Sequence, residues 1–230
     1  LTAILKYALA CLMLLSGSLP VMASGSYLFD SYTVEDGLSH NTVWCALQDS
    51  YGFVWFGTIN GLNCFDGRNS VVYRASSQGG ENSLGNNFIR SLFEDKKGRI
   101  WVGTNCGIYI YDRSRDAFSF FDRKTEFDVP VSSEVSSIVQ LSDSLIAIAT
   151  LGQGVFFYHT GSQTLRQDNI HSSFVWDVCV GADKGFCISS LMNDILCFDR
   201  QGNYMKTYQL PAIKGVRASF GRVHCLQPVG

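Results

Sequence analysis

The sequence predicts an all-β protein, a β-propeller of about four four-stranded blades plus the start of a fifth. Two observations predict this fold. The chain repeats itself about every 40 to 47 residues, roughly the length of one propeller blade. Each copy also supplies four short runs rich in Val, Ile, Phe, Tyr and Thr, separated by turn residues, as a four-stranded blade requires.

The first two copies of the repeat are the clearest. Each contains Leu-x-x-Asn-x-Val/Ile, then Asp-x-x-Gly-x-x-Trp-x-Gly-Thr, then Gly-Leu/Ile-x-x-Phe/Tyr-Asp. Two weaker copies follow, and a fifth begins near the end of the chain. We expect a propeller segment at residues 24–230, with copies at about 38–80, 84–126, 131–168 and 172–210 and the fifth from about 218.

The second copy indicates how one blade divides into strands. The expected strands are residues 89–93, 99–103, 108–111 and 117–121. Lys97-Gly98 suits the turn of a hairpin, because glycine adopts a positive φ at little cost. Helical repeats have a similar period, but β-branched and aromatic residues dominate these runs and glycine interrupts every copy, which argues against helices.

Residues 1–23 are expected to be a signal peptide. Lys6 precedes an apolar run from Tyr7 to Leu15, which is short for a bilayer core of about 30 Å. The small residues of Val21-Met-Ala23 fit cleavage after Ala23. A buried N-terminal helix is the alternative, and the lack of an amphipathic period disfavours it. We therefore expect an exported chain.

Residues 27–32, Tyr-Leu-Phe-Asp-Ser-Tyr, match the outer-strand runs at 71–73 and 118–121. We expect this segment to be the fourth strand of a blade whose other three strands lie outside this chain. Propellers close their ring in this way and so leave few exposed strand edges.

The composition indicates a globular chain without affinity for nucleic acid. Apolar residues make up 46% of the chain and charged residues 17%, enough for a sizeable core. Lys and Arg number 18 against 20 Asp and Glu, and no basic run could follow a phosphate backbone. No cofactor motif is present in the sequence.

Eight cysteines do not predict a disulfide framework. Cys11 would leave with the signal peptide, and the remaining seven cannot all pair. Cys64 and Cys197 stand where other copies have Ile110 and Phe157, so we interpret them as small hydrophobic residues in strands. Without a Cys-x-x-C pair or a Cys/His cluster, no metal site is indicated.

The Trp-x-Gly-Thr strands invite two interpretations. Trp55 and Trp101 could stack on sugar rings, but one Trp at the same strand position in successive copies is better explained by packing between blades. Asp49 and Asp95 are interpreted as turn residues. A calcium loop would need more oxygen ligands than this pattern offers.

The three-part pattern resembles the two-component regulator propeller repeat, which builds the periplasmic sensor region of Bacteroidetes hybrid two-component sensor histidine kinases. The resemblance extends over residues 27–230 and is strongest in the first two copies. The third copy departs from it, with Ala147 and Ala149 in place of the Trp and the Gly. The family implies a non-catalytic segment on the periplasmic face of the inner membrane, within a full-length protein that dimerises and holds a membrane helix and a kinase elsewhere.

The candidate ligand-binding residues belong to the start of each innermost strand and to the turn between the second and third strands. In a propeller both open on the same face, around the central channel. Trp44 and Trp176 follow the apolar position of the innermost strand, where the second copy has Arg90, and strand alternation would turn them away from that position. The candidates are His40, Asn41, Trp44, Asn60, Asn87, Arg90, Asn105, Gln153, Trp176 and Asn193.

Aromatic rings, amides and an arginine suit an oligosaccharide, because Trp covers sugar C–H faces and amides bridge hydroxyls. The alternative is that the asparagines form turns and the tryptophans fill the channel. We therefore expect a periplasmic sensor that responds to an oligosaccharide or another periplasmic ligand. The rival functions are a propeller enzyme, such as a lyase or quinone dehydrogenase, and a protein-binding scaffold. Scattered histidines with no nucleophile motif nearby give no support to nucleophilic catalysis.

Overall fold

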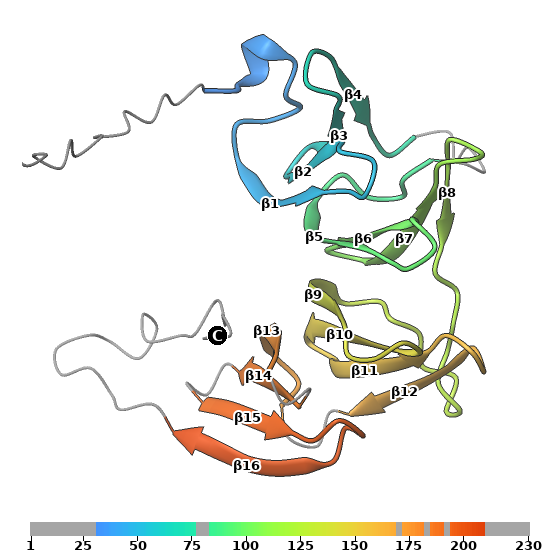
Figure 1. Ribbon diagram of the computed structural model, residues 1–230, viewed down its shortest axis with the longest axis vertical. Helices are drawn as coiled ribbons and strands as arrows, with labels where there is room; N and C mark the ends of the chain where they lie inside the picture. The colour runs from blue at the N-terminus through green and yellow to red at the C-terminus, as the bar shows by residue number, and fades with distance from the viewer. Residues whose placement is uncertain (1–30, 77–82, 169–171, 182–184, 191–193, 210–230) are drawn as a thin grey trace, which may run out of the picture. The chain divides into compact units, whose positions relative to one another are not determined.

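The computed structural model describes residues 31–76, 83–168, 172–181, 185–190 and 194–209. Within these residues the strands form four four-stranded antiparallel sheets, one after another along the chain (Figure 1). The expected all-β propeller architecture with about four blades is therefore confirmed. We call the sheets blades 1 to 4.

The strands of each blade follow the sequence order. Blade 1 contains β1 (Val43–Gln48), β2 (Val54–Thr58), β3 (Gly61–Phe65) and β4 (Ser70–Tyr73). Blade 2 contains β5 (Ile89–Glu94), β6 (Ile100–Thr104), β7 (Gly107–Asp112) and β8 (Ala117–Phe120). Blade 3 contains β9 (Glu134–Gln140), β10 (Leu145–Leu151), β11 (Gly154–His159) and β12 (Thr164–Asp168). Blade 4 contains β13 (Val175–Val180), β14 (Phe186–Ser190), β15 (Asp194–Phe198) and β16 (Tyr204–Gln209).

Successive strands in each blade are joined as antiparallel hairpins. The first strands of the blades are neighbours in space, since β1 contacts β5, β5 contacts β9 and β9 contacts β13 (Figure 1). A short 3-10 helix, η1 (Val34–Asp36), precedes β1. Each blade falls within one copy of the sequence repeat, and the strands of blade 2 agree with the expected ranges to within about two residues.

Several expectations concern residues outside the described ranges. The signal peptide, the fifth copy and residues 27–30 of the expected closing strand belong to this group. The chain divides into Leu1–Ser31 and Tyr32–Gly230, and the fold described here is that of the second unit. Among the described residues, no helix combines the length and apolar character needed to cross a bilayer.

The hydrophobic core lies between neighbouring blades. Trp55 of blade 1 is fully buried in a cluster with Ile100 and Val102 of blade 2. Trp101 of blade 2 is equally buried against Val135 and other residues of blade 3. These positions confirm that the repeated tryptophans are core residues, each covered by the blade that follows.

The glycine after each tryptophan is required by this packing. A Cβ atom at Gly57 would lie 2.7 Å from Cγ2 of Ile89, and one at Gly103 would lie 2.8 Å from Cγ1 of Val135. Ile89 and Val135 belong to the first strand of the next blade. Blade 3 has Ala149 at the equivalent place, so the spacing to blade 4 tolerates a methyl group there.

In blades 1 to 3 a threonine at or beside the end of the second strand closes the turn that follows. Thr58 Oγ1 donates to the Gly61 carbonyl over 2.9 Å, and Thr150 Oγ1 donates to the Gly154 carbonyl over 2.8 Å. The third copy lacks the Trp and the Gly, but it keeps the threonine and its hydrogen bond across the turn.

Candidate functional site

Each innermost strand contains a β-bulge at the same place. In β1 the pairing with β2 steps from Val43 to Cys45, so one residue has no partner opposite. Pairing in β5, β9 and β13 steps in the same way. The extra residues, which we call the bulge row, are Trp44, Arg90, Ser136 and Trp176.

A bulge changes the direction of the extra side chain and interrupts the alternation of a strand. The orientation expected for Trp44 and Trp176 from alternation therefore does not apply at this position. The position before the extra residue is Val or Ile in every copy, whereas the bulge row contains two tryptophans, an arginine and a serine. Bulges are common beside functional sites for this reason.

Arg90 connects three blades. Its guanidinium carbon lies 4.1 Å from the centre of the Trp44 ring in blade 1. Its Nε atom pairs with Oε1 of Glu134 in blade 3 over 2.5 Å. A cation over an indole face contributes about 0.5–2 kcal/mol, more when water is excluded. Arg90 therefore holds the Trp44 ring in one orientation, while its charge is balanced by Glu134.

The two ends of the bulge row differ in exposure. Trp44 is 50% exposed and also lies near Phe88, with 6.0 Å between ring centres. Trp176 is partly buried. Ser136 donates from Oγ to the carbonyl of Val175 over 2.5 Å, so it links blade 3 to blade 4. Trp44 thus presents the largest aromatic surface of the row to solvent.

Three of the other candidates bind backbone groups close to the bulge row. His40 Nδ1 accepts the Thr42 N–H over 2.9 Å. Asn41 Oδ1 accepts the Val34 N–H over 2.9 Å. Asn87 Oδ1 accepts the Ala75 N–H over 2.6 Å. Hydrogen bonds of this kind stabilise turns and chain crossings.

Gln153 has the most extensive backbone contacts among the candidates. Its Oε1 accepts the N–H groups of Ser132 and Ser133, and its Nε2 donates to the Pro130 carbonyl over 3.0 Å. Its side chain therefore holds the segment that leads into β9. Asn60 and Asn105 are exposed in the turns after β2 and β6. Asn193 lies outside the described residues.

The pairing register places the bulge row and these turns at the same end of each blade. Val43 pairs with Thr58 and Ile89 pairs with Thr104, so the start of the first strand lies beside the end of the second. Of the candidates, the structure brings Trp44 and Arg90 into direct contact.

Glu134 was missed by sequence reasoning, and Ser136 was not among the candidates although it stands at the position of Arg90 in the third copy. Both flank Val135, the residue equivalent to Ile89, so aligning the copies puts Glu134 near Arg90 on the adjacent first strand. Opposite charges at neighbouring repeat positions are a signal that could have identified the pair.

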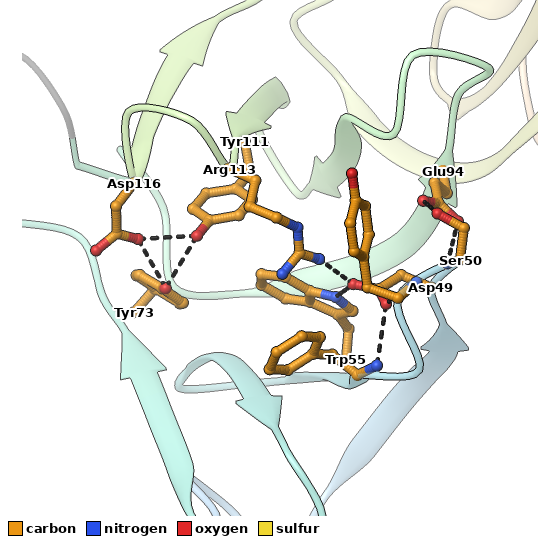
Figure 2. Close-up of polar contacts among 10 residues, drawn as sticks. Asp49, Ser50, Trp55, Tyr73, Glu94, Tyr111, Arg113 and Asp116 are labelled. Carbon is orange, nitrogen blue, oxygen red and sulfur yellow. Dashed lines mark hydrogen bonds and ion pairs between the residues drawn. The ribbon is translucent and has the colours of Figure 1, made fainter.

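A second polar cluster joins blades 1 and 2 at the turn between β1 and β2. Figure 2 shows Asp49 between the indole of Trp55 and the guanidinium of Arg113. The indole N–H donates to Asp49 Oδ2 over 2.8 Å, and Oδ1 accepts the N–H groups of Tyr51 and Phe53. Asp49 is therefore the turn residue that was expected, and it also anchors the buried tryptophan.

The same cluster continues toward the outer strands. Ser50 donates to Glu94 over 2.6 Å, and the hydroxyls of Tyr73 and Tyr111 both donate to Asp116 over 2.9 Å (Figure 2). Burial, followed by the hydrogen bonds with Tyr111 and Asp116, raises the pKa of Tyr73 well above its ordinary value. The hydroxyls of Tyr73 and Tyr111 are bound to the Asp116 carboxylate, so the cluster holds two blades together.

Neither cluster has the ligand set of a metal site. Within the described ranges, no group of three or more His, Cys, Asp or Glu side chains is placed to hold a metal ion. Arg90 and Ser136 of the bulge row already contact protein atoms, Arg90 through Glu134 and Ser136 through the Val175 carbonyl. The arrangement suits recognition of a neutral, partly apolar molecule.

Comparison with known proteins identifies the repeat. Residues 37–60 and 83–106 match the family model of the two component regulator propeller. The first two repeats of this chain thus match the two component regulator propeller repeat. The two matched ranges contain Trp44 and Arg90 as well as the turns with Asp49 and Asp95. We assign no catalytic step to this segment.

The similar proteins are much longer than the matched segments. Histidine kinase P4 from Formosa agariphila is 43% identical over 51 residues, which are 22% of this chain and 4% of that protein. The extracellular domain of a hybrid two-component system from B. thetaiotaomicron has a TM-score of 0.64 at 20% identity, covering 72% of this chain and 25% of that structure. Virginiamycin B lyase from Staphylococcus aureus, in a catalytically inactive form with quinupristin, has a TM-score of 0.57 at 17% identity. The match covers 74% of this chain and 56% of that structure. At these identities the solved structures show a shared propeller fold.

Proposed function

We propose that this regulator propeller is part of the exported sensing region of a two-component sensor, on the periplasmic side of the inner membrane. The repeats support the sensor assignment, and the basic residue, apolar run and small residues of positions 1–23 support export. In this proposal the membrane helix and the kinase belong to other parts of the full-length dimer.

The bulge row is the proposed ligand-binding face, and an oligosaccharide is the proposed ligand. The observation that carries this proposal is the half-exposed Trp44 ring, held in place by Arg90. A fixed indole can cover the C–H face of a sugar without a large loss of side-chain entropy. The exposed amides of Asn60 and Asn105 lie in turns at the same end of their blades and can bind sugar hydroxyls.

Binding at such a site is expected to be weak. An open aromatic surface with few polar groups supports a dissociation constant on the order of micromolar, which corresponds to about 8 kcal/mol of favourable binding free energy. Each tryptophan contributes about 1–2 kcal/mol of this, so its removal weakens binding about 5- to 30-fold.

Calorimetric titration of the complete extracellular region with oligosaccharides from plant and host glycans tests the proposal. We expect saturable binding of one class, weakened by Trp44→Ala, Arg90→Ala and Trp176→Ala. Phe127→Ala is the control, because Phe127 is 81% exposed on the segment between β8 and β9. Unchanged binding by all three variants would exclude the bulge row. Heat that continues after saturation would indicate turnover and favour a propeller enzyme.

A further inference from the structure

Blade 4 places three cysteines side by side. Cys179 of β13 pairs with Cys187 of β14, and Cys187 pairs with Cys197 of β15. Residues directly opposite each other on antiparallel strands share one face of the sheet, with Cβ atoms about 4.5–5.5 Å apart. The three thiols therefore form a row across the blade, although Cys187 and Cys197 are separated by a hairpin and Cys179 lies on a third strand.

The Sγ atoms of Cys187 and Cys197 lie 2.6 Å apart. Carbon atoms in non-bonded contact are about 3.5–4.0 Å apart, and sulfur is larger than carbon. A sulfur–sulfur bond is about 2.05 Å long. The separation of the two Sγ atoms is thus much nearer to a bond than to a contact between two thiols. Cys179, by comparison, directs its Sγ toward the Val180 carbonyl at 3.9 Å.

The position of the pair in the repeat is unusual. Cys187 occupies the place of Trp55 and Trp101, the tryptophans that blades 1 and 2 bury against the next blade. The core shared with blade 3 uses the other face of β14, through Phe186 and Ile188. Blade 4 therefore has a pair of sulfur atoms where two other blades have an indole anchored by an aspartate.

We propose that Cys187 and Cys197 form a disulfide across β14 and β15. The oxidant is a second disulfide, either within an oxidoreductase or in the oxidised form of a small thiol compound. A thiolate of the pair attacks one sulfur of that disulfide and releases the other as a thiolate. The second cysteine then attacks the mixed disulfide, so that the pair loses two protons and two electrons and the oxidant becomes two thiols.

This bond fixes the register of the hairpin in blade 4. It replaces the earlier interpretation of Cys197 as a simple hydrophobic residue, although Cys197 is indeed buried. Disulfides persist in exported proteins, so the inference agrees with the proposed function. It rests on the geometry of blade 4, and its test includes an arm that does not depend on export.

Mass spectrometry of the full-length protein, with thiols blocked by alkylation at cell lysis, tests the bond. Lys184 and Arg200 bound one tryptic peptide that contains both cysteines, so the disulfide appears as two unalkylated residues and the loss of two hydrogen atoms. Cleavage before Asp194 then gives two fragments that stay linked until they are reduced. We expect alkylation of this pair to rise at least tenfold after reduction.

Two variants assign the partner. Cys197→Ser should make Cys187 open to alkylation without reductant, whereas Cys179→Ser should leave the linkage intact. In the second arm, purified and reduced protein is reoxidised with oxidised glutathione. Full alkylation of both residues in both arms overturns the proposal, and so does linkage of Cys187 to Cys179. If the two cysteines are linked after reoxidation of the purified protein but not in cells, the result supports the bond and counts against export of the chain.

Discussion

The guanidinium of Arg90 lies 4.1 Å from the centre of the Trp44 ring, although the two residues belong to different blades. Both are the extra residues of β-bulges, and their contact couples the first strands of blades 1 and 2. The remaining side of Arg90 reaches Glu134 in blade 3. This chain of contacts makes the proposed binding face a property of three blades together.

We expect Arg90 and Trp44 to be energetically coupled. In a double-mutant cycle of Arg90→Ala and Trp44→Ala, the coupling should be about 0.5–2 kcal/mol in the free energy of unfolding. Urea unfolding of the four proteins gives this value. Arg115→Ala is a suitable control, because Arg115 pairs with Asp112 on an exposed turn, and it should be additive with Trp44→Ala. If the losses caused by Arg90→Ala and Trp44→Ala were also additive, the predicted coupling would be wrong.

The two classes of tryptophan should differ in their contribution to stability. Trp101→Ala removes a fully buried side chain and should lower the free energy of unfolding by about 3–5 kcal/mol. Trp44→Ala removes a half-exposed ring and should cost clearly less. Chemical denaturation of both variants decides the question, and equal losses would place Trp44 among the core residues.

The close packing at Gly103 predicts a destabilising methyl group. Gly103→Ala should cost about 1–3 kcal/mol, because the new Cβ would clash with Oγ of Ser91 and lie 2.8 Å from Cγ1 of Val135 in the next blade. The double variant with Val135→Ala should lose less than the sum of the two single variants, since it removes Cγ1 of Val135, the nearest atom of the next blade. Thermal unfolding provides the comparison. A loss equal to the sum would mean that the two positions do not interact.

Asp95 should make stability depend on pH below about 5. Burial raises the pKa of its carboxyl group, but hydrogen bonds from Trp101 and Arg99 outweigh that effect and lower the pKa below its ordinary value. The unfolded chain, with a pKa of about 3.9, therefore binds a proton more readily than the native one. The stabilisation is fully present above that unfolded value and is lost as the pH falls toward the native one.

Asp95→Asn removes this contribution. The variant should be less stable at neutral pH, and its free energy of unfolding should change less than that of the unaltered protein between pH 5 and about 3. Urea titrations across this range measure both effects. Parallel pH profiles for the two proteins would show that Asp95 titrates alike in the native and unfolded states.

Much of the fold could be predicted from the sequence, because it depends on local patterns. The period of the repeat and the β-branched runs predicted four blades, and glycine and aspartate marked the turns. Trp55 and Trp101 were correctly assigned to the core, since a residue repeated at one strand position points to packing between neighbouring copies.

The candidate site depended on contacts that no local pattern contains. The bulges exist in the pairing register of two strands, so a single strand does not reveal that Trp44 and Arg90 are extra residues. The hydrogen bonds of Asn41 and Gln153 likewise became visible only once their backbone partners were placed.

Residues close together in the chain are enough to predict the four-bladed β architecture, the core tryptophans and the turns, since each follows from local chemistry. The side-chain contacts between strands and blades, in contrast, are visible only in the folded structure. It brought Arg90 between Trp44 and Glu134, and it set Cys187 against Cys197. Those contacts join residues from different strands or blades, and their distances follow from register and from the packing of one sheet on the next.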